Sequence, residues 1–528
     1  MSITQQLDTA FRAAIQAAFG LDADPAIAAS ANPQFGDYQS NAALALAKRV
    51  SESTGQKTNP RTVAEQIKSK LNLGEVASEI SIAGPGFINV KLSPAWLASR
   101  ANATLADGKL GTSPSANPIT VVVDYPSVNV AKEMHIGHLR PSTIGDALAR
   151  ALRFLGHDVV PQNHIGDWGT AFGMLITYME ETSKGTAAPI GDIEQFYKAS
   201  KQRFDEDPAF ATASRQAVVR LQAGEPKELA LWQQILDLSR KHLAEMFALM
   251  GILVTRENER GESFYNPMLP DVVRELREKG IAVESDGAIV IWVKGYEAPL
   301  MIQKSDGGYG YGTTDLAAVR FRTRELGAKR VIVGTDIRQK QHFEQFIDAA
   351  TRAGWLNGVA YEHVMFGAIQ GPDGRPFKTK SGENVKLADV LHEAVDRAKE
   401  VDAVKSQALS DEEKSAVAKT VGIGAVKYYD LVRDRMTDYR FDWDAMLAMD
   451  GNTAPYLMMA HARICGIFRK AAVARGVEGD ATRSADGVGA REAPAAFRRS
   501  GGGRRARPQA ALPVHVFVRD RREVQQLL

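Results

Sequence analysis

The sequence predicts a multidomain α/β protein with an N-terminal α+β module, a doubly wound parallel sheet with a helical insertion, and an incomplete all-α bundle at the C-terminal end. At 528 residues the chain exceeds one ordinary domain, and about two to four domains are expected. A buried strand at residues 119–124, a helix at residues 137–156 and a strand at residues 158–162 form a βαβ unit, the start of a doubly wound sheet. Helical periodicity without strand signals over residues 410–475 indicates the all-α bundle.

The N-terminal α+β module is expected over residues 1–100. Apolar residues recur at helical spacing over residues 4–19 and predict an amphipathic helix. The other predicted elements are helices at residues 39–50 and 62–71 and a pair of strands at residues 79–82 and 86–92. Residues 101–118 are rich in Gly, Ser, Ala and Asn, so a linker is expected there.

The α/β domain is expected over residues 115–400 and has a Rossmann-like pattern. Its first strand, residues 119–124, is a short apolar and β-branched run, as the buried strands of parallel sheets are. Residues 191–252 are helical and polar, and they predict an insertion. Further strand candidates are residues 288–293, 300–303 and 330–334, and the helical bundle is expected over residues 410–476.

The composition fits a folded protein and excludes several classes. Hydrophobic residues make up 44% and charged residues 24% of the chain, and the net charge of +2 does not mark a nucleic-acid binder, although a local basic face could bind one. The single cysteine, Cys465, excludes an intramolecular disulfide framework and argues against a Cys-based metal site. No apolar run approaches the length of a membrane span, and the N-terminus lacks the pattern of a secretory signal. The cytoplasm is the expected location.

Two histidines three residues apart, His135 and His138, stand where the first strand of the sheet turns into its helix. Ligands of such sheets bind at the carboxyl ends of the strands, where a helix N-terminus offers free N–H groups to phosphate. Gly137 lets backbone and nucleotide approach closely, and the imidazoles can donate to phosphate oxygens as charge develops on them. The alternatives are a surface pair on a helix and a zinc site, which lacks a third ligand at suitable spacing.

The segment His135-Ile-Gly-His138 resembles the signature of the class I aminoacyl-tRNA synthetases, and its flanks resemble the arginyl enzymes in particular. The similarity continues in order through residues 32–41, 83–92, 139–146, 162–169, 305–318 and 451–463. It spans roughly residues 1–475, and an ordered series of motifs is far more specific than one four-residue motif. The resemblance implies an enzyme that activates L-arginine with ATP and Mg²⁺ and then loads it onto tRNA(Arg).

The second phosphate element of the family is a mobile loop with two lysines, and residues 371–382 match it. The resemblance assigns Lys378 and Lys380 to the β- and γ-phosphates. Phe377 stands where the class places its first lysine, and Lys132, just before the histidine motif, is the candidate for the missing charge. The alternative for the two loop lysines is a solvated loop without a role.

Arginine demands an anionic pocket that matches the planar donor fork of its guanidinium. Asp315 matches the substrate-binding aspartate of the family, and Tyr311 lies four residues earlier, on the same face if the turn is helical. The resemblance also assigns Gln341 to the amino-acid pocket, and Ser127 and Asn129 to the α-amino and α-carboxylate ends of arginine. The alternatives are that Asp315 caps a helix and that Tyr311 is a core aromatic residue.

Two regions resemble the parts of the family that contact tRNA. The N-terminal module resembles the extra domain that arginyl enzymes lay against the outer corner of tRNA, with Phe87 and Asn89 in the matching segment, although a strand-borne Phe is more often part of a core. The helical module resembles the anticodon-binding bundle, where Tyr456 can stack on an unpaired base. The family often has a second aromatic residue three positions later, where this chain has Met459.

The composition changes abruptly after Gly476, and residues 477–528 are expected to form an irregular tail rich in Arg, Gly and Ala. Residues 481–528 hold ten Arg against four acidic residues. One interpretation is a disordered basic tail that touches RNA. The other is a shifted reading frame, because residues 516–528 can be back-translated so that a one-base shift gives a string similar to a helix of the family's anticodon-binding bundle.

The tail has a structural consequence under either interpretation. A helical bundle requires each amphipathic helix to bury its apolar stripe against the others, and the tail supplies no such stripe. Exposed apolar surface is therefore expected on the helix around residues 456–468.

The expected function is ATP-dependent ligation of arginine to tRNA(Arg) by a cytoplasmic monomer without a membrane segment or a protein-bound metal. One alternative is another class I synthetase, such as a cysteinyl enzyme, against which the lack of zinc-type Cys and His ligands counts. The other is a non-catalytic tRNA-binding relative. Intact His135, Gly137, His138 and Asp315 favour an enzyme, whereas the altered C-terminal end favours lost function.

Overall fold

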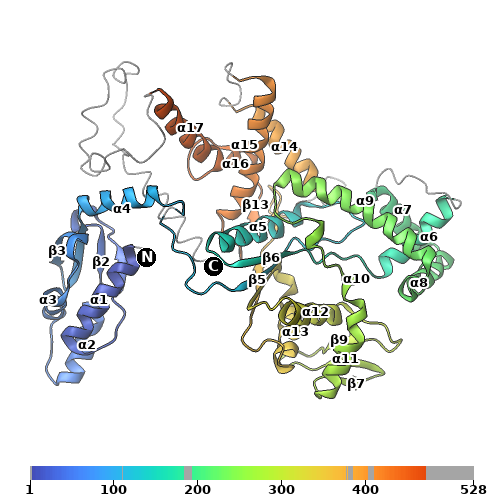
Figure 1. The fold of residues 1–528 in the computed structure, drawn as a ribbon, viewed down its shortest axis with the longest axis horizontal. Helices are drawn as coiled ribbons and strands as arrows, with labels where there is room; N and C mark the ends of the chain where they lie inside the picture. Colours follow the sequence, from blue (N-terminus) through green and yellow to red (C-terminus); the bar gives the residue numbers. More distant parts are fainter. Residues whose placement is uncertain are drawn as a thin grey trace. The chain divides into compact units, whose positions relative to one another are not determined.

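The computed structural model describes residues 3–109, 111–183, 193–375, 377, 385–401 and 409–470 (Figure 1). The chain forms two compact units, the first ending at Pro114 and the second beginning at Ser115. The loop lysines Lys378 and Lys380 and the tail expected at residues 477–528 lie outside the described residues. No helix of the described part is long and apolar enough to cross a membrane.

The first unit combines helices with a four-stranded antiparallel sheet in the order β1-β2-β4-β3. Its elements are α1 (Ile3–Phe19), β1 (Ile27–Ala29), β2 (Tyr38–Ser40), α2 (Ala42–Thr54), α3 (Pro60–Lys70), β3 (Ala77–Ala83), β4 (Phe87–Leu92) and α4 (Pro94–Ala106). Leu7, Phe11 and Ile15 of α1 are fully buried in one core with Ile67 of α3 and Ile88 of β4. The apolar stripe that predicts α1 therefore packs against the sheet, as an amphipathic helix should.

Two predictions for this unit are wrong at their boundaries. The helix expected over residues 39–50 begins later, because Tyr38–Ser40 pairs with β4 as a strand and tertiary pairing overrides local propensity. The linker expected over residues 101–118 contains the second half of α4. That helix begins firmly, because the Ser93 hydroxyl caps it and Pro94 occupies its first turn.

A four-stranded parallel sheet in the order β11-β10-β5-β6 forms the centre of the second unit and confirms the predicted fold class. Its elements are β5 (Thr120–Asp124), α5 (Leu139–Phe154), β6 (Asp158–Gln162), β10 (Arg330–Asp336), α13 (Lys340–Arg352) and β11 (Ala360–Phe366). The chain winds outward from β5 to β6, and from β10 to β11 on the other side. The carboxyl ends of β5 and β10 therefore border the switch-point crevice in which such sheets bind ligands.

Between β6 and β10 the chain adds a helical insertion and a second small sheet (Figure 1). The helices predicted over residues 191–252 are confirmed as α7 (Ile193–Glu206), α8 (Pro208–Ala223) and α9 (Pro226–Met250), and a further helix, α6 (Thr170–Ser183), precedes them outside the predicted range. It is followed by α10 (Glu262–Tyr265), α11 (Leu269–Glu278), β7 (Val283–Ser285), β8 (Ala288–Ile291), β9 (Leu300–Gln303) and α12 (Tyr311–Arg320). The predicted strands at residues 288–293 and 300–303 thus belong to an antiparallel sheet with β7, outside the doubly wound sheet.

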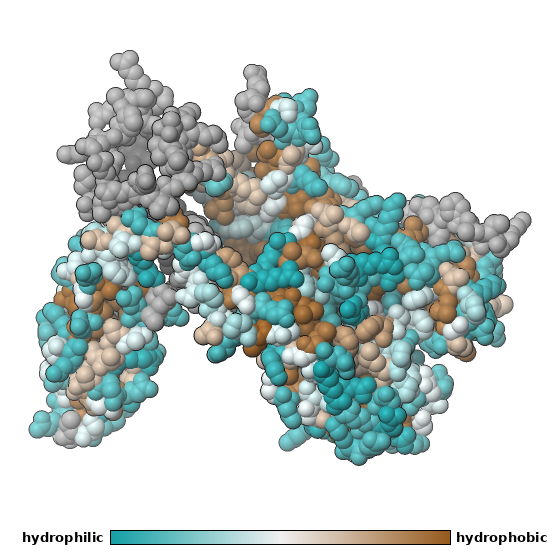
Figure 2. Space-filling view, in the orientation of Figure 1, coloured by the Kyte–Doolittle hydropathy of each residue, from teal (hydrophilic) through white to brown (hydrophobic). Residues whose placement is uncertain are grey.

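The remainder of the second unit is mainly helical. Its elements are β12 (Ile369–Gln370), α14 (Leu387–Lys399), α15 (Asp411–Leu431), β13 (Tyr439–Arg440), α16 (Trp443–Leu447) and α17 (Ala454–Lys470). The expectation of no strand after residue 410 is wrong, because β13 pairs in parallel with β12. Ile464 and Ile467 of α17 are 48% and 65% exposed, which confirms the expected apolar surface on this helix. In Figure 2 hydrophobic surface appears over these upper helices, whereas the region around α11 is mainly hydrophilic.

A buried ion pair joins the doubly wound sheet to the helical end. Nε of Arg140, on α5, lies 2.9 Å from Oδ1 of Asp430, on α15, and the two side chains are 1% and 0% exposed. Nη1 of Arg140 also donates to the carbonyl oxygens of Gly367 and Thr437, at 2.8 and 3.1 Å. One guanidinium therefore ties together α5, the end of β11, the segment before β13, and α15.

Replacing Asp430 with Ala should destabilise the second unit strongly, because it leaves the Arg140 guanidinium buried without a counter-charge. A loss of about 3–5 kcal/mol is expected. Urea unfolding followed by tryptophan fluorescence measures it. The matched control is Glu393→Ala, which breaks an exposed ion pair with Arg397 on the neighbouring α14 and should cost about 0.5 kcal/mol or less. Equal losses in both variants would contradict the role of the buried pair.

Candidate active site

A single 3₁₀ turn, Ile136–His138, leads from β5 into α5, with His135 as its N-cap and His138 as its last residue. Nδ1 of His135 accepts from the Gly137 N–H at 3.1 Å, and Nδ1 of His138 accepts from the His135 N–H at 3.0 Å. A neutral imidazole that accepts at Nδ1 carries its proton on Nε2. Both rings therefore keep an Nε2–H donor for a ligand, and their centroids lie 3.9 Å apart.

The surroundings keep both imidazoles neutral. Burial and then the neighbouring His135 lower the pKa of His138 to about 3. Burial and then the charge of Lys132 lower the pKa of His135 below its ordinary value. The pair therefore acts through neutral N–H donors rather than as imidazolium cations.

The segment that follows the lysine loop pairs with the histidine motif. The Ile136 N–H donates to the Val385 carbonyl at 2.9 Å, and the Leu387 N–H donates to the Met134 carbonyl at 2.8 Å. Lys386 lies between them as the antiparallel partner of His135. The backbone thus ties the downstream end of the phosphate loop to the strand-to-helix turn.

Two glycines of this region leave room for neighbouring rings. A Cβ on Gly137 would lie 2.8 Å from Cε1 of His135, so this glycine permits the ring position of His135 as well as the expected close approach of a nucleotide. A Cβ on Gly145, within α5, would lie 2.3 Å from Cγ of the buried Tyr125. Close packing of α5 on the end of β5 therefore depends on Gly145.

The residues expected to hold the ends of arginine follow β5 directly. The Ser127 hydroxyl donates to Oδ1 of Asp124 at 2.8 Å, and its N–H donates to Oδ1 of Asn163 at 3.1 Å. Asn129 is exposed, and its backbone bridges to Gly166, where a Cβ would lie 2.0 Å from the Asn129 Oδ1. Both predicted residues thus lie at the carboxyl end of β5, on the same loop as the histidine motif.

Asp124 is the buried anchor of that loop. Its carboxylate pairs with the Arg322 guanidinium, which also donates to Oε1 of Gln162 at 2.7 Å and to the Tyr361 hydroxyl at 3.0 Å. Burial alone would raise the pKa of Asp124, but the charges of Arg322 and His164 hold it below its ordinary value. Asp124 therefore stays ionised and can hold the Ser127 hydroxyl. Sequence reasoning missed this partnership, because Arg322 lies far away in the chain.

The expected guanidinium pocket lies where α12 meets α13. Oδ2 of Asp315 lies 2.6 Å from Nε2 of His342, and the Tyr311 ring contacts the His342 ring at a centroid distance of 4.6 Å. Asp315 is inside α12, whose N-cap is Gly310, and Tyr311 is 67% exposed. The two alternative interpretations, that Asp315 caps a helix and that Tyr311 is a core aromatic residue, are therefore wrong. The fifth predicted residue, Gln341, is exposed in the first turn of α13, next to His342.

A second carboxylate near Asp315, that of Glu262, was missed by sequence reasoning; it is carried by α10, which packs on α12. Burial, and then the negative charges of Asp167 and Asp315, raise the pKa of Glu262 to about 7. Asp167 accepts from the Ser263 hydroxyl and N–H, at 2.6 and 2.9 Å. The sequence offered one signal for Glu262, since it is an acidic residue at the start of the short helix α10. Only packing of α10 on α12 reveals its neighbours.

The three residues expected to contact tRNA differ in exposure. Phe87 is partly exposed at the start of β4, whereas Asn89 is 1% exposed and accepts from the Gln39 side chain at 3.1 Å. Tyr456 is partly exposed in the first turn of α17. A tRNA contact near Asn89 would therefore be made through the more exposed Gln39.

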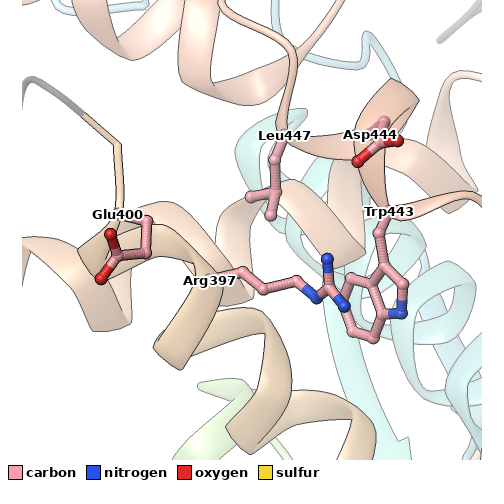
Figure 3. Close-up of a pocket in the computed structure, with 5 residues that line it drawn as sticks. All are labelled: Arg397, Glu400, Trp443, Asp444 and Leu447. Carbon is pink, nitrogen blue, oxygen red and sulfur yellow. The ribbon is translucent and has the colours of Figure 1, made fainter.

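A shallow pocket lies between α14 and α16, remote in sequence from the histidine motif (Figure 3). The Arg397 guanidinium lies 5.0 Å from the Trp443 ring centroid there, and Glu400, Asp444 and Leu447 complete its lining. No residue predicted for the site belongs to it. Elsewhere among the described residues, no group of three or more His, Cys, Asp or Glu side chains is arranged to hold a metal ion.

Comparison with protein families agrees with this geometry. Residues 100–443 match the model described as tRNA synthetases class I (R), catalytic domain, and residues 5–92 match the model of the arginyl tRNA synthetase N terminal domain. Fold and site thus define a class I aminoacyl-tRNA synthetase.

Relatives and solved structures specify the family. The chain is 47% identical to the arginine–tRNA ligase of Chromobacterium violaceum, over 89% of this chain and 83% of the relative. It is 46% identical to the arginine–tRNA ligase of Klebsiella pneumoniae strain 342, over 89% and 82%. The crystal structure of arginyl-tRNA synthetase from Plasmodium falciparum matches with a TM-score of 0.76 and 31% identity, over 89% of this chain and 81% of that one. The chain belongs to the arginyl-tRNA synthetase family.

Replacing His138 with Ala should lower the turnover number far more than it weakens ATP binding, because the Nε2–H donor serves charge that develops in the transition state. A loss on the order of 10²–10³-fold in kcat is expected. Steady-state ATP–pyrophosphate exchange measures both parameters. Normal turnover of the variant would place the phosphate chemistry elsewhere.

The His138 imidazole should remain neutral well below pH 6. Because its pKa of about 3 lies below the ordinary value of about 6.5, protonation favours the unfolded chain. This residue therefore lowers the stability of the fold as pH falls from about 6.5 toward 3, and it contributes no change above that window. Imidazole ¹⁵N shifts recorded from pH 7 to pH 5 measure the charge, and a titration midpoint near 6.5 would contradict the assignment.

Proposed function

We propose that this protein ligates L-arginine to tRNA(Arg) with ATP, through an arginyl-adenylate. The carrying observation is the neutral His135–His138 pair at the switch point of the sheet, in one unit with the anionic pocket around Asp315. The donors suit phosphate, and the carboxylates suit guanidinium. We also propose the domain bounds 1–100, 115–400 and 410–476 for the tRNA-contacting module, the catalytic domain and the anticodon-binding domain.

In the first step the carboxylate oxygen of arginine attacks the α-phosphorus of ATP, and the bond to pyrophosphate breaks. In the second step a ribose hydroxyl at the 3′ end of tRNA attacks the carbonyl carbon, and AMP leaves. The Nε2–H groups of His135 and His138 donate to phosphate oxygens as the α-phosphorus becomes five-coordinate. Catalysis rests mainly on positioning and on stabilising charge.

Positive charge for the β- and γ-phosphates comes from lysines rather than from the histidines. We assign Lys132, Lys378 and Lys380 to this role, and Lys132 is the described one, exposed beside the histidine motif. Phe377, in place of a further lysine, lies against Phe441 with a centroid distance of 5.2 Å and so anchors the loop rather than serving phosphate. Mg²⁺ accompanies the nucleotide, because a hard divalent cation prefers phosphate oxygens.

Arginine specificity comes from the carboxylates. His342 engages Oδ2 of Asp315, which leaves Oδ1 to accept from the guanidinium, and Glu262 supplies a second carboxylate. With a pKa of about 7 in the unliganded site, Glu262 ionises fully once a cation lies beside it. Tyr311 and Gln341 border the pocket.

The α-amino and α-carboxylate groups of arginine then meet Ser127 and Asn129. Asp124 holds the Ser127 hydroxyl at 2.8 Å, so this end of the site is pre-organised before substrate binds. In this proposal the reactive carboxylate of arginine lies at the loop that also carries the histidine pair.

For tRNA we propose contacts by the N-terminal module at Phe87 and Asn89, the latter through Gln39, and by the helical end at Tyr456. We further propose a cytoplasmic monomer.

The two alternative functions fit the site less well. A cysteinyl enzyme would gain nothing from two carboxylates in its amino-acid pocket. A non-catalytic relative has no use for two histidines held in the donor tautomer.

Pyrophosphate exchange with each amino acid, with and without tRNA, tests the activity, and exchange with an amino acid other than arginine would overturn the proposal.

Replacing Asp315 with Asn should raise the Michaelis constant for arginine by on the order of 10–100-fold, because the variant keeps the size of the side chain but removes charge opposite the guanidinium. The Michaelis constant for ATP should change little. The control is Asp348→Asn on α13, whose carboxylate pairs with Arg352 at the surface. An unchanged value for arginine would move the pocket elsewhere.

A further inference from the structure

Helix α7 of the insertion contacts both segments that flank the phosphate site. Nζ of Lys132, three residues before His135, lies 4.4 Å from the ring centroid of Tyr197. Nζ of Lys386 lies 3.0 Å from Glu194 on the same helix. The insertion therefore contacts both the segment before the histidine motif and the segment after the lysine loop.

The two lysines are held by different chemistry. Lys386 is also 2.7 Å from Glu133, so two carboxylates surround its ammonium, and their hydrogen bonds raise its pKa. Its charge is thus compensated within the protein. The face of Tyr197, in contrast, attracts the Lys132 ammonium through the ring quadrupole and adds no negative charge. A π face is the contact that fixes a cation and leaves its charge available to a polyanion.

The position of the Lys132 ammonium fits that use. The side chain is exposed and carries four rotatable bonds, so it needs a partner to hold one position. The charge of Lys132 acts on His135, because after burial it is the second cause of the lowered pKa of the His135 imidazole. The ammonium held on Tyr197 belongs to the residue three before His135, and its charge acts on that imidazole.

We propose that Tyr197 is a positioning residue for the adenylation step, which holds the Lys132 ammonium beside the His135–His138 pair for the phosphates of ATP. The inference rests on the proposed function, because Lys132 is assigned there to phosphate. It makes the helical insertion part of the phosphate site, although no side chain of α7 belongs to the predicted site.

The test is a double-mutant cycle in pyrophosphate exchange, with the full chain, arginine, ATP and tRNA. Tyr197→Leu removes the π face and keeps apolar bulk, and it should lower kcat about two- to fivefold, the size of one exposed cation–π contact. Tyr197→Phe keeps the face and should restore the rate. In a Lys132→Met background, Tyr197→Leu should have no further effect on kcat.

The matched control is Phe196→Leu. Phe196 neighbours Tyr197 on α7 but packs against Tyr178 of α6, at a centroid distance of 5.1 Å. Its effect on kcat should be the same with and without Lys132, and thermal unfolding shows whether each variant is folded. If Tyr197→Leu lowers the rate equally in the Lys132→Met background, Tyr197 is merely structural and the inference is wrong.

The remaining outcomes separate the inference from the function on which it rests. No exchange by the unmodified protein with arginine would overturn the proposed function and the inference together. A Lys132→Met variant as active as the unmodified protein would remove the phosphate role of Lys132 and the inference, while arginine activation stands. A lowered rate for Lys132→Met with no effect of Tyr197→Leu overturns the inference alone.

Discussion

The buried pair of Arg140 and Asp430 is the constraint on which the second unit depends. Arg140 is the second residue after His138, so the helix that begins at the histidine motif is held at its first turn by a charge with no access to water. A buried arginine is tolerated only when its donors find acceptors. Here Nε forms the ion pair with Asp430 and Nη1 donates to the carbonyl oxygens of Gly367 and Thr437, whereas Nη2 has no hydrogen-bond partner among the described residues. A displacement of α15 would therefore leave the Arg140 charge buried without a partner, or it would displace the histidine turn together with α5.

A second buried ion pair, between Asp124 and Arg322, also joins distant segments of this unit. Asp124 ends β5, and Arg322 follows α12, the helix that carries Asp315. The pair ties the loop of Ser127 and Asn129 to the helix of the guanidinium pocket. Under the proposed assignment of the site, a single ion pair thus connects the two segments that would hold the two ends of arginine. Rigid support of this kind is what orientation of a reactive carboxylate requires.

Local sequence patterns predicted the elements that depend on neighbouring residues. They failed for elements and contacts that depend on segments far away in the chain. The run at residues 119–124 suffices for β5, because a strand buried on both faces is continuously apolar, and the stripe of α1 suffices for α1, because burial on one face leaves a periodic pattern. The strand β2 was hidden inside a helical pattern, since only its pairing with β4 makes it a strand. Motif resemblance singled out Asp315 and the histidines as candidates, whereas Glu262 becomes a candidate only through the packing of α10 against α12. The partnership of Arg322 with Asp124 was missed for the same reason, because no local pattern in the sequence indicates a buried arginine.

The state of the histidine pair explains why cations must come from elsewhere in the site. Two imidazoles with centroids 3.9 Å apart repel each other once protonated, and a backbone N–H donated to each Nδ1 fixes both in the neutral Nε2–H form. Neutral donors suit the α-phosphate, whose charge is transient, because they need no desolvation of a full charge. The β- and γ-phosphates keep their charge throughout and need ammonium groups instead. Of the lysines proposed for that role, Lys132 is the described one, and its ammonium lies against the Tyr197 ring, 4.4 Å from the ring centroid. The proposed site thus divides the charge between two kinds of donor, with neutral imidazoles for the α-phosphate and ammonium groups for the β- and γ-phosphates.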